Sequence, residues 1–214
     1  MQLNFASATT GRHQELRRLL GERILMLDGA MGTMIQSYGL DEMGYRGDKF
    51  YDCEHDLKGN NDILSLTQKG IIQEIHEKFL NAGADIIETN SFNATSISQG
   101  DYGTERLVYK INKAAAEIAC QAAAAVQIKS PKRARFVAGA LGPTNKTASI
   151  SPDVNNPGYR NVSFDELADA YEEAIHGLID GGVDLLLIET VFDTLNCKAA
   201  IYAAERHFCK TRRS

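Results

Sequence analysis

The sequence lacks several features that would place it in a special class of protein. It has no tryptophan and only four prolines. No segment approaches the roughly 18 uninterrupted apolar residues of a membrane span, and the N-terminus lacks the apolar core and cleavage site of a secretory signal. Basic residues are not in excess, because 23 Lys and Arg stand against 28 Asp and Glu, a net charge of -5. We therefore expect a cytoplasmic protein with no nucleic acid and no membrane among its partners.

Cysteine is also sparse, and its spacing argues against disulfides and against zinc. The four cysteines, Cys53, Cys120, Cys197 and Cys209, lie far apart and form no Cys-x-x-Cys pair. Reduced thiols are therefore expected. The pair His207 and Cys209 is too close in sequence for a usual zinc site. The sequence predicts no metal site built from this chain alone.

Four short apolar runs indicate the strands. They cover residues 24–27, 84–87, 136–141 and 184–188, and each ends in polar or glycine residues. Near-continuous apolarity is typical of parallel strands buried on both faces. The chain has 214 residues, of which 43% are hydrophobic, so it can form a globular core. A complete α/β barrel, however, takes about 250 residues.

Helical patterns alternate with these runs. Ser163 with Glu166 three residues later forms a predicted capping box at the start of one helix, and Gly181-Gly182 ends it. An N-terminal helix precedes the first strand. The other helices are expected over residues 68–81, 104–128, 164–179 and 194–207.

Repeated β-α units imply a parallel sheet with right-handed crossovers, either open or closed into a barrel. The turn at residues 28–33 lacks the third glycine of a dinucleotide-binding fingerprint, and the loops at 37–61 and 142–163 are long and polar. Such loops build the active sites of barrels, so we favour the barrel. The predicted fold is α/β, of the (β/α)8 TIM-barrel type, with only the first four β-α units present and an N-terminal helix.

Polar residues follow every predicted strand. In a barrel the carboxylates of Asp28, Glu88 and Glu189 would converge on one rim and surround a cationic group such as an ammonium. The alternative is that such carboxylates cap helices or hold loops, which is favoured for Asp193. Glu88 and Glu189 are harder to dismiss, because each is the last side chain of an apolar strand, where an unpaired charge is costly.

Two glycine-containing phrases also have two interpretations. The turn at residues 28–33 lets the backbone approach a ligand, or only makes a tight turn. The phrase at 139–145 presents backbone donors and the Asn145 amide to a ligand, or is a proline-fixed loop. Met26, Met31 and Met34 are expected to fill the core. No Cys-His, Ser-His-Asp or Gly-x-Ser-x-Gly arrangement is visible, so no catalytic residue is assigned.

Five phrases together resemble a known family. They are LDGAMGTMIQ at 27–36, LKGNND at 57–62, GADIIETNSFN at 83–93, GPTNKTASISPDVN at 142–155 and IETVFDTLN at 188–196. They are similar to the homocysteine-binding module of the cobalamin-dependent methionine synthases, within the homocysteine S-methyltransferase family. The likeness runs from about residue 22 to about residue 204, nearly the whole chain.

The resemblance implies a barrel that binds homocysteine, activates its thiol on zinc and passes it a methyl group from methylcobalamin. The methyl group comes from 5-methyltetrahydrofolate on other modules. Zinc would deprotonate a thiol whose pKa is otherwise about 8.5. Asp28 with its glycine-rich turn and Glu189 match the family's homocysteine-binding elements. With the strand-end residues above, the expected homocysteine site comprises Asp28, Gly29, Ala30, Met31, Gly32, Thr33, Glu88, Asn90, Asn145 and Glu189.

The chain departs from the family pattern in its second half. The family's zinc thiolates come from later strands, and none of the four cysteines matches them, so the zinc ligands and the cobalamin module are expected to be absent. We divide the chain into a lead-in helix at 1–21, a partial barrel at 22–205 and a basic tail at 206–214 unlike the family.

The alternatives to a working methyltransferase follow from this departure. A half-barrel exposes two open edges, so we expect a truncated product that pairs with a complementary barrel fragment or with itself. The alternative function is an inactive homocysteine-binding or interaction fragment. An aldolase-like lyase is disfavoured, because no lysine stands at a strand end.

Overall fold

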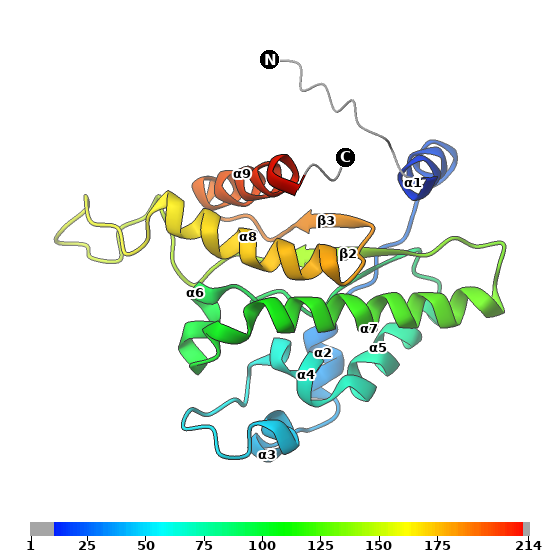
Figure 1. Cartoon of the computed structure of the whole chain (residues 1–214), viewed down its shortest axis with the longest axis horizontal. Helices are drawn as coiled ribbons and strands as arrows, with labels where there is room; N and C mark the ends of the chain where they lie inside the picture. Colours follow the sequence, from blue (N-terminus) through cyan, green and yellow to red (C-terminus); the bar gives the residue numbers. More distant parts are fainter. Residues whose placement is uncertain (1–10, 212–214) are drawn as a thin grey trace.

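A computed structural model describes residues 11–211 and has an α/β fold. Three parallel strands, β1 (Ile86–Glu88), β2 (Phe136–Leu141) and β3 (Leu185–Ile188), form one sheet in the order β1-β2-β3 (Figure 1). In register, Ile87 pairs with Val137, and Gly139 pairs with Leu186. All residues of β2 are buried, which agrees with the continuous apolar run from which it was predicted.

The expected first strand at residues 24–27 is reduced to one parallel bridge between Leu27 and Ile86. The backbone N–H of Met26 bonds the side chain of Asp85, at 3.0 Å, instead of a strand partner. The segment also lies at the edge of the sheet, where Ile24 is 85% exposed. The side-chain bond and the unpaired edge explain why the apolar run does not extend into a strand.

The predicted helices are all present, with shifted ends. The capping box of α8 (Phe164–Asp180) forms as expected, since the Glu166 N–H donates to Ser163 Oγ and the Ser163 N–H donates to Glu166 Oε2. The other long helices are α1 (Gly11–Glu22), α5 (Lys69–Ala82), α7 (Val108–Lys129) and α9 (Thr194–Thr211). Short helices are α2 (Met31–Gln36), α3 (Glu42–Arg46), α4 (Leu64–Thr67) and α6 (Ser96–Gln99), with 3-10 turns η1 (Gly47–Lys49), η2 (Asn61–Ile63), η3 (Gly100–Tyr102) and η4 (Glu105–Leu107).

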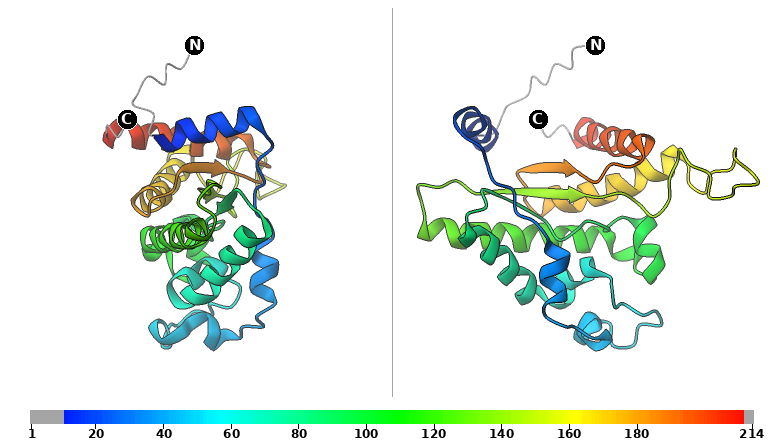
Figure 2. Two further views of the ribbon diagram at one scale, coloured as in Figure 1. Left: turned by 90° about the vertical axis from the view of Figure 1, so that its right-hand side faces the viewer. Right: turned by 180° about the vertical axis from the view of Figure 1, so that it is seen from behind.

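Helices α5, α7, α8 and α9 form a layer beside the sheet. Helix α5 packs on α7, α7 on α8 and α8 on α9, in chain order, as Figures 1 and 2 show. The largest core cluster joins α8 and α9 to Leu141 at the end of β2, and another joins α5 and α7 to Ile87 and Val137. Because the crossover helices pack in sequence on parallel strands, the carboxyl ends of the strands all lie on one side of the molecule.

Ion pairs hold the N-terminal ends of the strands. The side chain of Asp85 is 1% exposed and pairs with Arg23 and Arg133, while Arg12 of α1 pairs with Asp184 at 2.9 Å. Residues 1–10 of the expected lead-in lie outside the described residues. These arginine pairs tie α1 and the following segment to the sheet at the end opposite the strand carboxyl ends.

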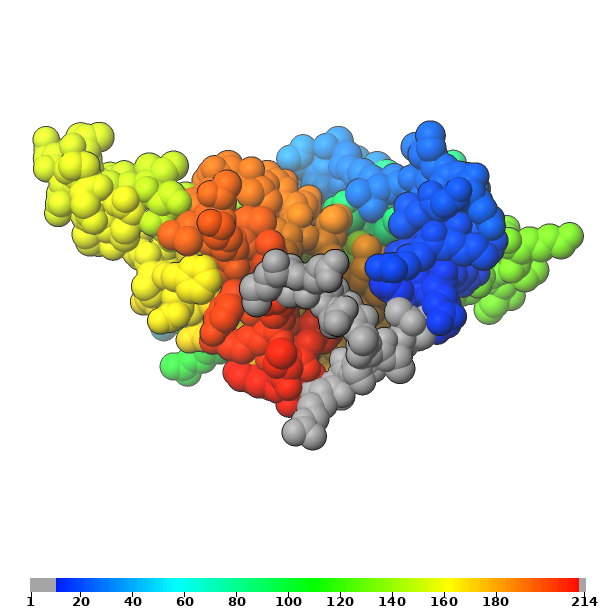
Figure 3. All heavy atoms as spheres, turned by 90° about the horizontal axis from the view of Figure 1, so that it is seen from above, coloured from blue at the N-terminus to red at the C-terminus, as the bar shows by residue number. Residues whose placement is uncertain are grey.

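The loop from β2 to α8, residues 142–163, is long and largely exposed. It projects from the body in the space-filling view, where α1 and α9 lie on the same face (Figure 3). Residues 206–211 of the expected tail are the last turns of α9, where Arg206 pairs with Asp169 at 2.7 Å, and residues 212–214 lie outside the described residues.

Apolar side chains remain exposed at both sides of the sheet. On the side of the bridge, Met26 is 58% exposed, so its prediction as core filling is wrong, because no strand within residues 11–211 covers this edge segment. Met31 and Met34 do pack against a core cluster. On the side of β3, Ile201, Tyr202 and Phe208 of α9 are each more than 40% exposed. None of the helices within residues 11–211 is long and apolar enough to cross a membrane.

Candidate functional site

A cavity of about 390 Å³ lies at the carboxyl ends of β1 and β3. It unites most of the residues that the sequence marked for ligand binding. The predicted residues that line it are Asp28, Gly29, Ala30, Met31, Gly32, Glu88, Asn90 and Glu189, and the further lining residues are Asn61, Asp62, Thr89, Ser91, Phe92 and Asn93.

Three carboxyl groups from three different β-α units meet in this cavity. Asp28 Oδ1 accepts the backbone N–H of Glu88 at 3.0 Å, which fixes the Asp28 side chain beside the end of β1. Glu88 is the last residue of β1 and Glu189 directly follows β3, and both line the same cavity. The convergence on one rim that the strand-end pattern predicts is thus present in the structure.

The electrostatics of these groups favour a cationic ligand. Burial raises the pKa of Asp28 to about 7, and burial together with the nearby Glu189 raises the pKa of Glu88 to about 7. Burial also raises the pKa of Glu189. The residues lining the cavity include four acids and no Lys, Arg or His. A positive group placed among them would stabilise the ionised carboxylates.

Two backbone features lie beside these carboxylates. Thr190, directly after Glu189, has φ 53, the left-handed region that a β-branched residue rarely adopts. Such strain is held where the surrounding structure requires it, here at the turn that ends β3. A Cβ added at Gly29 would meet no atom within 4 Å, so the backbone there faces open space beside the cavity. The backbone at Gly29, next to Asp28, is therefore open to a ligand.

Asp62 was missed by the sequence reasoning. It belongs to η2, is 4% exposed, and accepts the backbone N–H of Asn93 at 3.1 Å. Burial raises its pKa to about 7. It was missed because it follows no strand, and the only signal was its place in the phrase at 57–62. Asn90, which was predicted, donates its amide to Asn61 O at 2.8 Å and to Ser65 Oγ at 3.2 Å, so its donors hold the cavity wall.

Two predicted residues do not line the cavity. Thr33 is on α2 and exposed, and Asn145 is in the exposed loop after β2, where its amide donates to Asp101 Oδ2 at 2.7 Å. Asp193 caps the start of α9, as its alternative interpretation predicts, because its Oδ1 accepts the N–H of Leu195 at 2.8 Å.

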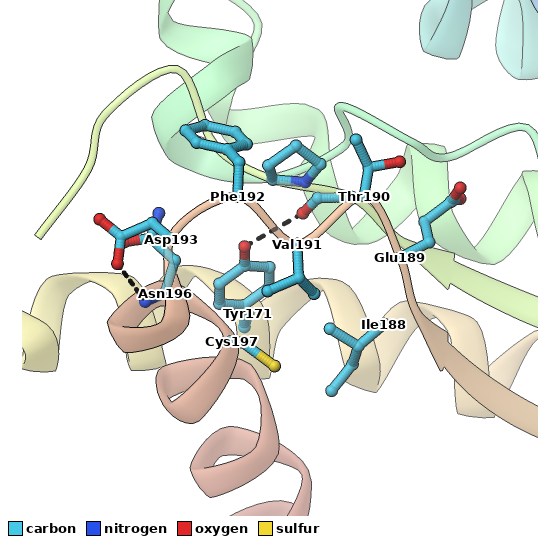
Figure 4. Close-up of a pocket in the computed structure, with 11 residues that line it drawn as sticks. Tyr171, Ile188, Glu189, Thr190, Val191, Phe192, Asp193, Asn196 and Cys197 are labelled. Atoms are coloured by element: carbon cyan, nitrogen blue, oxygen red, sulfur yellow. Dashed lines mark hydrogen bonds between the residues drawn. The ribbon is translucent and has the colours of Figure 1, made fainter. Parts of the chain in front are cut away.

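A second, much smaller cavity of about 10 Å³ lies beside the carboxyl end of β3 and is shown in Figure 4. There Tyr171 donates to the carbonyl of Gly142 at 3.0 Å, and the Glu189 side chain points away from Tyr171 and Asn196. A Cβ on Gly142 would lie 2.3 Å from the carbonyl oxygen of Phe92. The glycine at 142 is therefore needed for close packing of two loops, and this cavity is too small for an amino acid.

The described residues do not fit a zinc ion. Between residues 11 and 211 no three His, Cys, Asp or Glu side chains stand close enough to hold a metal. All four cysteines are free thiols, three of them half-buried and Cys209 exposed.

Comparison with known proteins gives a consistent family and fold. A model of the family "Homocysteine S-methyltransferase" matches residues 25–212. The metallated form of the homocysteine methyltransferase MmuM from Escherichia coli is similar at 23% identity and a TM-score of 0.68, covering 93% of this chain and 64% of that chain. Its oxidized form is similar at 24% identity and a TM-score of 0.66, covering 93% and 63%. The chain thus spans less than two-thirds of the length of these structures, and at these identities the likeness shows the fold.

Proposed function

Because the chain belongs to the homocysteine S-methyltransferase family, we propose that it is the homocysteine-binding part of a methyltransferase that converts homocysteine to methionine. The observation that carries the proposal is the cavity where Asp28, Glu88 and Glu189 meet with no cationic side chain among the lining residues. These carboxylates would hold the amino group, in a partial (β/α)8 barrel. The backbone of residues 29–33 would contact the amino-acid end of the ligand. Asn90 would fix the wall of the cavity through its hydrogen bonds to Asn61 and Ser65.

We further propose that the methyl donor is methylcobalamin, recharged from 5-methyltetrahydrofolate, as in methionine synthases. This proposal rests on the five sequence phrases, above all the one at 142–155. The loop that bears it projects at the carboxyl end of β2 (Figure 1). The role of this chain's own residues is to bind and orient homocysteine, because the described residues do not supply zinc ligands. A cytoplasmic location agrees with the free cysteines.

The direct test is homocysteine binding measured by calorimetry on the full chain. We expect Glu189→Gln to weaken binding by about tenfold, since a lost charge-assisted hydrogen bond costs about 1.5 kcal/mol. Glu166→Gln is the matched control, because Glu166 caps α8 away from the cavity. Equal affinity of the two variants would remove Glu189 from the site, and no binding by the unmodified chain would contradict the proposed function.

A second candidate function is an inactive homocysteine-binding or interaction fragment. It is favoured by the exposed apolar side chains at both sides of the sheet, such as Ile24 at 85% and Phe208 at 43%. A complementary barrel fragment or a second copy of the chain would cover them. Methyl transfer from methylcobalamin to homocysteine, assayed with the chain alone and with added zinc, separates the two candidates, because only a working site gives methionine.

A further inference from the structure

An amino acid carries a carboxylate next to its ammonium group, and the acids of the cavity at the strand ends repel that carboxylate. The residues lining this cavity include four acids and no Lys, Arg or His. Among them, only neutral N–H and O–H groups can therefore bind the carboxylate of a ligand. The lining side chains that carry such donors are those of Asn61, Thr89, Asn90, Ser91 and Asn93.

Most of these donors are already used inside the protein. Ser91 Oγ donates to Ala140 O at 2.8 Å and is hydrogen-bonded to Thr89 Oγ1 at 2.7 Å, so Thr89 supplies the hydrogen of the second bond. The Asn90 amide donates to two acceptors in the cavity wall. Asn93 is exposed, and no hydrogen bond among residues 11–211 holds its side chain in one orientation.

Asn61, in contrast, is held in place through its other polar groups. The hydroxyl of Tyr45, a residue of α3 that is only 7% exposed, donates to Asn61 Oδ1 at 2.8 Å. The backbone N–H of Asn61 donates to Gly59 O at 3.0 Å, and its carbonyl accepts the Asn90 amide at 2.8 Å. These bonds fix the side chain and leave its NH2 group as the one part that is not engaged.

This NH2 group lies where the glycine-rich turn lines the cavity. No acceptor within residues 11–211 is hydrogen-bonded to Asn61 Nδ2, which lies 3.7 Å from the position that a Cβ would take on Gly32. A side chain at residue 32 would contact the amide, whereas glycine leaves it uncovered on that side. Two of the family-like phrases, at 27–36 and 57–62, thus meet at a donor that is oriented and free to bind a ligand.

We propose that the Asn61 side-chain amide binds the carboxylate of the ligand, so that the cavity selects α-amino acids over amines that lack a carboxylate. The inference rests on the proposed function and adds a specificity-determining residue to it. Tyr45 is a positioning residue, because it touches only Asn61 Oδ1 and holds the NH2 group toward the cavity. Binding breaks no covalent bond and transfers no proton.

The test compares two ligands that differ only in the carboxylate, L-homocysteine and 3-aminopropane-1-thiol, by calorimetry on the full chain with a reductant. At pH 8 the carboxyl groups of Asp28 and Glu88, whose pKa burial raises to about 7, are largely ionised. Asn61→Asp keeps the shape of the side chain and an acceptor for Tyr45, but replaces the NH2 donor with an oxygen. We expect its affinity for homocysteine to fall by about tenfold or more, and its affinity for the amine to stay equal or rise.

The matched control is Asn81→Asp, which adds the same charge at an exposed asparagine of α5 that does not line the cavity. It should leave both affinities unchanged. Tyr45→Phe removes the bond to Asn61 Oδ1 and should weaken homocysteine binding by about threefold, with no effect on the amine. Added to Asn61→Asp, it should weaken homocysteine binding no further, because the amide that it positions is gone.

The outcomes separate this inference from the proposed function. Equal losses for both ligands in Asn61→Asp and in Tyr45→Phe would give Asn61 a structural role only. Unchanged affinities, or equal binding of the amine and homocysteine by the unmodified chain, would show that the amide does not recognise the carboxylate. Each of these results overturns the inference and leaves the proposed function standing. Absence of homocysteine binding by the unmodified chain would contradict the proposed function and the inference with it.

Discussion

His76 of α5 is a buried histidine that no polar group within residues 11–211 stabilises. It is 0% exposed, and both of its ring nitrogens lack a hydrogen-bond partner in this part of the chain. Burial lowers its pKa to about 4, because a charged imidazole would have no compensation there. Residue 76 falls in the helix expected over residues 68–81, but no local pattern shows which neighbours cover its side chain.

We predict that this histidine makes the fold sensitive to mild acid. Between pH 6.5 and about 4 the unfolded chain binds a proton at His76 that the folded chain refuses, so stability is lost as the pH falls through this window. Relative to His76→Leu, the unmodified chain should lose about 2 kcal/mol more of unfolding free energy between pH 7 and 5. Urea unfolding at the two pH values measures this difference. The same loss in both proteins would show that His76 is solvated.

The residues of the site differ in how far the sequence could identify them. Glu88 and Glu189 were identifiable because an acid at the end of an apolar strand must be paired or used. Asp62 was not, because its burial follows from the way η2 packs under the β1–α6 loop, which no local pattern encodes. Asn145 follows a strand like the others, but the long loop after β2 carries it away from the cavity.

At the scale of elements, helix starts with a specific chemical signal were the most predictable. The predicted start of α8 agrees with the structure to the residue, because Ser163 and Glu166 form both bonds of the capping box. Helix α9, expected to end at 207, continues to Thr211, since no glycine or proline stops it and Arg206 pairs with Asp169 and Glu172 of α8. Tertiary ion pairs of this kind are invisible in a local pattern.

The capping box provides a stability prediction for α8. Ser163→Ala removes the side-chain acceptor of the Glu166 N–H and should lower the free energy of unfolding by about 1 kcal/mol. Ser130→Ala, at the exposed end of α7, is the control and should change the free energy of unfolding by less than about 0.5 kcal/mol. Thermal or urea unfolding of the two variants measures the difference in their free energies of unfolding. If Ser163→Ala and Ser130→Ala lower the free energy of unfolding equally, the capping box contributes nothing to stability beyond the intrinsic helix propensity of the side chain.

At the scale of the whole molecule, the two ends of the sheet have opposite character. Arginines gather at the N-terminal ends of the strands, where Arg23 and Arg133 pair with Asp85 and hold the pKa of that carboxyl well below its usual range. Acids gather at the carboxyl ends, in a cavity whose lining residues include no basic side chain. This separation of a stabilising end from the end that carries the cavity is the arrangement expected of parallel α/β folds. The alternation of strands and helices made it predictable, whereas the reduction of the first strand to a bridge was not.

The open sides of the sheet lead to a prediction about association. Ile24 is 85% exposed beside the bridge at one side of the described sheet, and Phe208 is 43% exposed on α9, the helix that contacts the outer strand β3 at the other side. We expect sedimentation velocity to show association that grows with protein concentration. The double substitution of Ile24→Lys and Phe208→Lys should shift the chain to monomer, because a charge at an open edge opposes pairing.

The control for this experiment is Val154→Lys in the long loop. Val154 is 92% exposed but belongs to the projecting loop between β2 and α8, away from both sheet edges. If apolar exposure alone drove association, Val154→Lys would weaken it as much as the edge substitutions do. If the edges drive it, Val154→Lys leaves the sedimentation profile unchanged. A monomer at all concentrations in the unmodified chain would mean that its open edges are not adhesive, and self-association would then be excluded as its way of covering them.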